Sequence, residues 1–138
     1  MGTWDAGSFG NDDAADWVWQ MEEAEDLHIV EEAFDRVVEE LTGDNFVEAP
    51  TGSEAIAACE VIARLKGKFG ERSTYSEGID NWVAVHPMRP DDALLAKANR
   101  ALDIVMSDQS ELHELWKDTE SFDQWQKNVS DLGQRMNA

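Results

Sequence analysis

Carboxylates are the most abundant groups in this sequence that could do chemistry. Eleven acidic side chains lie between positions 22 and 48, and Arg36 is the only base among them. If residues 26–41 form a helix, several of these acids share one strip of its surface. We expect the strip to consist of Glu25, Glu32, Asp35 and Glu39. Repulsion within this face would cost roughly 1–3 kcal/mol of stability, which suggests a partner that needs the charge.

The charge is concentrated in the first part of the chain. The 138 residues carry a net charge of −19. Residues 1–60 hold 17 acids and one base, or −16, whereas residues 61–138 hold 13 acids and 10 bases, or −3. Such a surface repels nucleic acid and anionic membranes, so we expect neither as a partner. It attracts cations and basic proteins.

Trp19 is the aromatic side chain that we expect in the same contact surface. It lies about 200° around a helix from Trp17, so the two cannot share one buried stripe. Trp17 has helical spacing to Ala14 and Met21 and is expected in the core. Large aromatic side chains often anchor protein–protein interfaces, and we therefore predict that Trp19 binds a partner together with the four carboxylates.

Two functions are consistent with this surface. The first is a small acidic binding protein that covers a basic protein partner, such as a nuclease-type toxin, as an immunity or inhibitor protein would. The alternative is a non-catalytic structural or self-associating helical domain, in which the acids improve solubility. In that case they could also meet the basic cluster of a second copy, so a homo-oligomer is possible. The cluster consists of Arg64, Lys66, Lys68 and Arg72.

Other residue types with chemical potential are scattered. His28, His86 and His113 lack zinc-site spacing, and the aspartates of residues 12–16 do not follow a calcium-loop pattern. Cys59 lies between apolar residues and is expected to be a buried small side chain. No nucleophile elbow or phosphate-loop spacing occurs. We therefore expect no catalytic site, no cofactor and no specific metal site, and leave open loose divalent binding by the acidic strip.

The elements that position these residues are helices. Apolar side chains recur every three or four positions along almost the whole chain, and no stretch alternates with period two. This pattern predicts an all-α, single-domain bundle of about six helices spanning residues 1–138. An irregular segment rich in glycine and tryptophan comes first, and we expect Trp4 and Phe9 to anchor it on the bundle.

Capping residues predict where the helices begin and end. Asn11 suits the N-cap of the first helix, and Thr42-Gly43 would end the second. Residues 51–54 read as a capping box that opens the third helix, which Gly67 would end. Pro90 suits the first position of a later helix, and residues 121–124 form a second capping box.

Three further expectations concern exposure and location. Leu115 is predicted to face inward from a short helix near residue 111, and the basic residues 64–72 to lie in a solvated loop. The single cysteine permits no internal disulfide, and no apolar run approaches the ~20 residues of a membrane span. The first twenty residues carry no lysine or arginine, unlike a signal peptide, so we expect a cytoplasmic protein.

The opening of the chain resembles an uncharacterised family of bacterial domains. Members begin with Gly-x-Trp, Gly-x-Phe and Asn-Asp-x-Ala-x-Asp-Trp. The matching residues here are Gly2, Trp4, Gly7, Phe9, Asn11, Asp12, Ala14, Asp16 and Trp17. The segments "SELHELW" and "WQKNVSDL" are similar to the C-terminal half of the family. The resemblance implies no established activity and no catalytic residue.

Overall fold

The computed structural model describes residues 7–138, which form seven helices and no strand. The helices are α1 (Asp12–Glu22), α2 (His28–Asp44), α3 (Ala49–Leu65), α4 (Glu77–Val85), α5 (Asp92–Val105), α6 (Glu111–Lys117) and α7 (Phe122–Asn137). One isolated bridge joins Val47 and Ser110. The predicted all-α class is confirmed. The described residues form seven helices where about six were expected.

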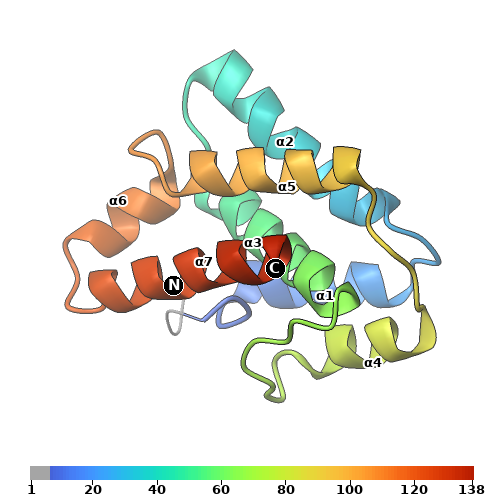
Figure 1. Ribbon diagram of the computed structural model, residues 1–138. Helices are drawn as coiled ribbons and strands as arrows, with labels where there is room; N and C mark the ends of the chain where they lie inside the picture. Colours follow the sequence, from blue (N-terminus) through green and yellow to red (C-terminus); the bar gives the residue numbers. More distant parts are fainter. Residues whose placement is uncertain (1–6) are drawn as a thin grey trace.

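Helix α3 runs through the middle of the molecule and packs against all six other helices (Figure 1). Every residue from Ala55 to Arg64 is buried, including Cys59 as predicted. A helix that is covered on all sides is the core of its fold. Its many alanines keep the side chains short, so neighbouring helices approach closely.

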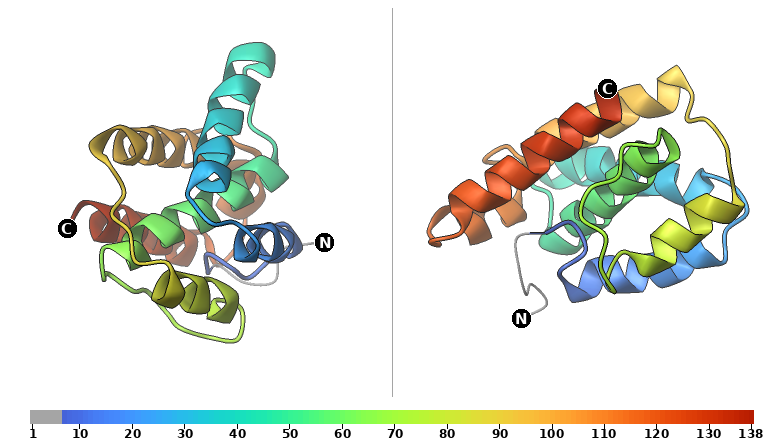
Figure 2. Two further views of the ribbon diagram at one scale, coloured as in Figure 1. Left: turned by 90° about the vertical axis from the view of Figure 1, so that its right-hand side faces the viewer. Right: turned by 60° about the horizontal axis from the view of Figure 1, so that its bottom comes forward.

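The remaining helices surround α3 in pairs. Helices α2 and α5 pack together on one side of it, and α1 and α4 pack together on the opposite side (Figure 2). Helix α7 lies along α3 and also touches α5 and α6. In each helix the buried side chains follow the apolar stripe of the sequence, for example Trp125, Val129, Leu132 and Met136 in α7.

The first three helices have ends that partly agree with prediction. Asn11 caps α1 as expected, because its Oδ1 accepts a hydrogen bond from the Ala14 amide at 2.8 Å. Helix α2 does not stop at Thr42-Gly43. It continues to Asp44 because Asn45 takes the left-handed conformation that ends it, with φ 55°. Gly67, with φ +79°, ends α3 as predicted.

The predicted capping boxes are wrong. Helix α3 begins at Ala49, before residues 51–54, with a proline in its first turn. Ser121 precedes α7 without a side-chain cap. Pro90 also lies outside its helix, because Asp91 caps α5 by accepting a hydrogen bond from the Leu94 amide at 2.7 Å. At α5, Asp91 thus supplies the cap in place of Pro90.

Two exposure predictions have opposite outcomes. Phe9 is buried against the bundle as expected. Leu115 is exposed rather than inward, because α6 is short and buries mainly Leu112. The expected anchor Trp4 lies outside the described residues. No helix within residues 7–138 has the length and apolar character that crossing a membrane requires.

Candidate functional site

The acidic strip lies on the outward face of α2. Glu32 and Glu39 are exposed and Asp35 is half-buried, whereas the opposite face of the helix packs on the core. The structure therefore brings these three carboxylates onto one surface, as predicted. Glu25 is exposed but lies in the connection between α1 and α2, because α2 begins only at His28.

Part of the strip is neutralised by a base far away in the sequence. Lys97 of α5 lies 3.1 Å from Glu31 Oε2 and 3.0 Å from Asp35 Oδ1. Hydrogen bonds to Asp35 and Glu31 raise the pKa of Lys97. Arg36, the local base identified in the sequence, instead pairs with Glu54 of α3 at 2.5 Å. Some charged side chains of α2 thus form ion pairs with side chains of α3 and α5. Such half-exposed ion pairs contribute little to stability.

Glu40 has a structural role. One of its carboxylate oxygens accepts a hydrogen bond from the Glu48 amide at 3.0 Å, and the other accepts from the Thr51 hydroxyl. These donors lie at the start of α3, where backbone N–H groups lack partners and negative charge is favoured. Glu40 therefore caps α3 from the neighbouring helix, which offsets the cost of its charge on α2.

Trp19 is the most exposed large hydrophobic side chain in the described part of the chain, with 77% of its surface accessible. Trp17 is 2% exposed and lies in the core. The predicted opposite orientation of the two tryptophans is therefore confirmed, while the role of Trp19 in binding stays a prediction.

Two separate hollows lie beside predicted contact residues. A surface cavity of about 190 Å³ beside Trp19 is lined by α1, Phe9 and residues 74–78. A separate groove of about 360 Å³ beside Asp35 and Glu39 lies between α2 and α5, with Lys97 and Arg100 on its other wall. The two hollows share no lining residue, and whether Trp19 and the α2 strip bind the same partner stays a prediction.

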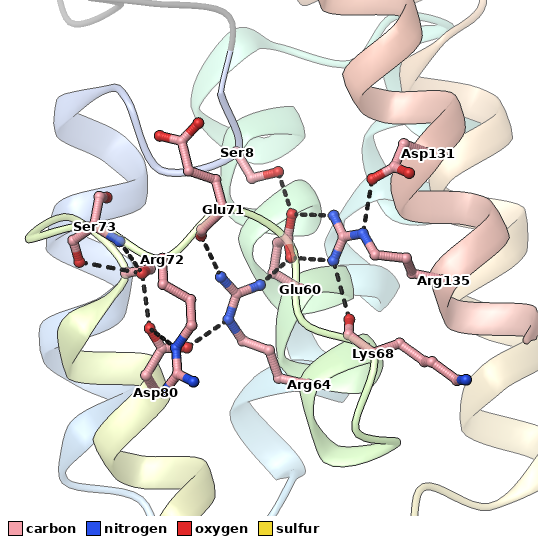
Figure 3. A network of polar contacts seen from close by, with 11 residues as sticks. Ser8, Glu60, Arg64, Lys68, Glu71, Arg72, Ser73, Asp80, Asp131 and Arg135 are labelled. Carbon is pink, nitrogen blue, oxygen red and sulfur yellow. Dashed lines mark hydrogen bonds and ion pairs between the residues drawn. The ribbon is translucent and has the colours of Figure 1, made fainter.

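A buried network of charges surrounds Glu60, and the sequence pattern did not predict it (Figure 3). Arg64 is 1% exposed and pairs with Glu60 one helical turn earlier. Its Nε donates to Asp80 Oδ1 at 2.7 Å and its Nη2 to the Glu71 carbonyl at 2.8 Å. The prediction that residues 64–72 form a solvated basic loop is therefore wrong for Arg64.

Arg135 of α7 completes this network. Its two terminal nitrogens each donate to one oxygen of the Glu60 carboxylate at 2.8 Å, and its Nε donates to Asp131. Hydrogen bonding to Glu60 raises the pKa of Arg135 despite partial burial. Ser8 also donates to Glu60 at 2.6 Å. The network therefore joins α3, α4, α7 and the N-terminal segment.

With Arg72, whose Nε lies 3.7 Å from Asp80 Oδ2, the network contains three bases and three acids. These groups pair with one another, so we assign the network to stability rather than chemistry. The Glu60–Arg64 spacing could have been recognised in the sequence as an i,i+4 pair within an apolar helix. The partners Asp80 and Arg135 carried no such signal. An adjoining cavity of about 110 Å³ is lined in part by Glu60, Glu71 and Arg135.

The histidines and Cys59 lie apart from one another. His28 is 2.5 Å from Asp26, His86 stacks on Trp82, and His113 packs against Phe122. Burial raises the pKa of the Cys59 thiol well above its usual value. Across residues 7–138, no three histidine, cysteine or acidic side chains are grouped so that they could hold a metal ion.

The fold and these surfaces define a small helical domain built on one central helix, with a strongly acidic exterior over α1 and α2. The chain belongs to the family described as "Domain of unknown function (DUF4259)", whose model matches residues 2–128. This match confirms the resemblance in the opening residues and extends from that segment into α7. No curated protein and no solved structure matches the chain.

Proposed function

We propose that this protein is a small acidic binding protein of the cytoplasm that covers a basic surface on a partner protein. A nuclease-type toxin is the partner class that we favour, with this chain as its immunity or inhibitor protein. The observation that supports the proposal is the exposure of the acids in α1 and α2. Eleven of the 14 acidic side chains between positions 12 and 48 are exposed.

The fold uses only some of these charges. Asp12 and Asp13 occupy the first turn of α1, where negative charge is favourable. Glu40 caps α3, and Asp35 is bound to Lys97. Glu32 has no comparable role in the part of the chain that the structure describes. Repulsion of about 0.2–0.5 kcal/mol between like charges on one helix face opposes folding, so a partner would account for their presence.

The proposed mechanism has two stages. The field of the acidic half steers a basic partner into encounter, which raises the association rate. Contacts at the surface then exclude water and slow dissociation. Salt screens exposed charges over a distance of about 8 Å at physiological ionic strength, so the association rate should fall steeply as salt is added.

The test starts with capture of partners from the native cell, followed by identification by mass spectrometry. The expected partner is a basic protein whose association slows several-fold between low and high salt. If it is a nuclease, adding this protein should inhibit it. A recovered partner whose association rate does not depend on salt would contradict the proposed role of charge.

A charge-reversed variant and its control test the α2 strip. Glu32→Lys with Glu39→Lys changes two exposed carboxylates and leaves the Asp35–Lys97 pair in place. Asp108→Lys with Glu120→Lys makes the same charge change at exposed positions outside the acidic half. The first variant should slow association several-fold more than the second. Equal rates would remove the strip from the interface.

Self-association remains the alternative. The contact proposed for it joins the basic cluster at residues 64–72 to the acidic half of a second copy. Arg64 is buried and bound to Asp80, so it cannot take part in that contact. Sedimentation at two salt concentrations distinguishes the two functions. A homo-oligomer that dissociates when salt is added would favour self-association, whereas a monomer at both concentrations would favour a different partner.

A further inference from the structure

Trp19 is surrounded on α1 by carboxylates. In a helix, side chains three and four positions apart are neighbours. The acidic neighbours of Trp19 at these spacings are Asp16, Glu22 and Glu23, and all three are exposed. Asp12 lies one turn beyond Asp16 on the same face and is exposed as well. An accessible indole ring is thus bordered by negative charge on both sides along the helix.

A cavity of about 190 Å³ opens beside the same ring. Its lining includes apolar surface from Phe9, Ala15 and Val18, with Trp19 and Tyr75 as further aromatic walls. Glu22 also lines the cavity. This volume is below the roughly 300–1,000 Å³ typical of small-molecule sites. It is suited instead to a single side chain of a protein.

The carboxylate of Glu22 occupies a defined place in this wall. It lies against Gly78 in the first turn of α4, so close that a Cβ atom at position 78 would collide with it. The N-terminus of a helix favours a negative group. Because Gly78 has no Cβ, it leaves room for the Glu22 carboxylate beside the start of α4.

We propose that this cavity on α1 receives an arginine side chain from a basic segment of a protein partner. The inference rests on the proposed function and deepens it by naming the anchor. Arginine has an apolar stem that fits against Phe9 and Val18, and a planar cation that stacks on an aromatic ring such as Trp19. Its guanidinium group also donates two parallel hydrogen bonds to a carboxylate such as Glu22.

Charge complementarity selects this occupant over other side chains. An apolar partner side chain could cover Trp19, but it would bring Asp16, Glu22 and Glu23 into a drier environment without compensating charge. A lysine would satisfy the charge, but its compact and strongly hydrated ammonium group stacks less well. The α1 surface therefore predicts a preference for arginine over lysine, and for both over a neutral residue.

The experiment uses the full chain and three synthetic peptides in which glycine alternates with arginine, lysine or the neutral analogue citrulline. Binding is followed by two-dimensional ¹H–¹⁵N NMR, with the Trp19 indole signal assigned from Trp19→Phe. The arginine peptide should shift that signal and bind more tightly than the lysine peptide, and the citrulline peptide should not bind. Trp19→Ala should weaken arginine-peptide binding about tenfold. Circular dichroism checks that this exposed substitution leaves the fold intact.

A matched pair of variants locates the site. Asp16→Asn with Glu23→Gln and Glu32→Gln with Glu39→Gln each remove two exposed carboxylates, from α1 and α2 respectively. The α1 variant should weaken binding several-fold more. If the α2 variant has the larger effect, or if citrulline binds as well as arginine, the inference is overturned while the proposed function stands. A native partner that binds without salt dependence would overturn the proposed function itself.

Discussion

Arg135 of α7 and Glu60 of α3 lie 75 residues apart in the sequence and form a two-point ion pair in the fold, with both N–O distances at 2.8 Å. Glu60 is buried on the central helix, and Arg135 brings a compensating charge from outside it. The pair thus adds a polar contact between α7 and α3 to the apolar packing of α7. Ser8 of the N-terminal segment donates a hydrogen bond to the same carboxylate.

Loss of this pair should lower stability. Arg135→Gln leaves the buried Glu60 carboxylate with Arg64 and Ser8, so we expect the free energy of unfolding to fall by about 2–3 kcal/mol. Urea unfolding followed by circular dichroism measures the change. Arg89→Gln, at an exposed position, is the control and should change stability by less than about 0.5 kcal/mol. Equal effects of the two substitutions would contradict a role for the pair.

Adjacent glutamates on α2 should respond differently to the same change. Glu40→Ala removes the acceptor of the Glu48 amide and the Thr51 hydroxyl, so it should destabilise the protein by about 1–2 kcal/mol. Glu39→Ala removes an exposed charge from the repulsive strip and should be neutral or stabilise by about 0.2–0.5 kcal/mol. Thermal unfolding of the two variants tests this, and a common shift in Tm would refute the capping role.

Two helical glycines provide a second matched comparison. Gly43 has open space around the position of a Cβ atom, so Gly43→Ala should stabilise α2 by about 0.5–1 kcal/mol. In α3, a Cβ at Gly52 would lie 2.9 Å from Leu112 Cδ1. Gly52→Ala should therefore destabilise the contact between α3 and α6, by about 1–3 kcal/mol. Denaturant unfolding should move the two midpoints in opposite directions.

His28 should titrate above the ordinary value of 6.5. Its hydrogen bond to Asp26 raises the pKa of His28, and the His28 amide and side chain lower the pKa of Asp26. The stabilisation linked to protonated His28 is complete below about 6.5 and is lost as pH rises through the raised pKa. NMR titration of the His28 ring should show the pKa falling in Asp26→Asn. An unchanged pKa in that variant would exclude Asp26 as the cause.

Local features of the chain predicted much of the fold. Helices follow from the spacing of apolar residues, and the Asn11 cap and the Gly67 stop depend on atoms a few positions away. The exposure of Trp19 followed from its angle to Trp17 in the same way. Family membership was likewise visible in the first seventeen residues. The capping boxes failed because α3 begins earlier, at Ala49, and because the Ser121 side chain makes no cap hydrogen bond at the start of α7.

Contacts between distant residues depended on the tertiary structure. The sequence by itself determined that the protein is helical, that its first half is acidic, and which faces of its helices are apolar. Only the fold decided that Lys97 neutralises Asp35, that Glu40 caps α3, and that Arg64 is buried. The physical reason is that helix periodicity is a short-range property, whereas an ion pair depends on which helices pack together.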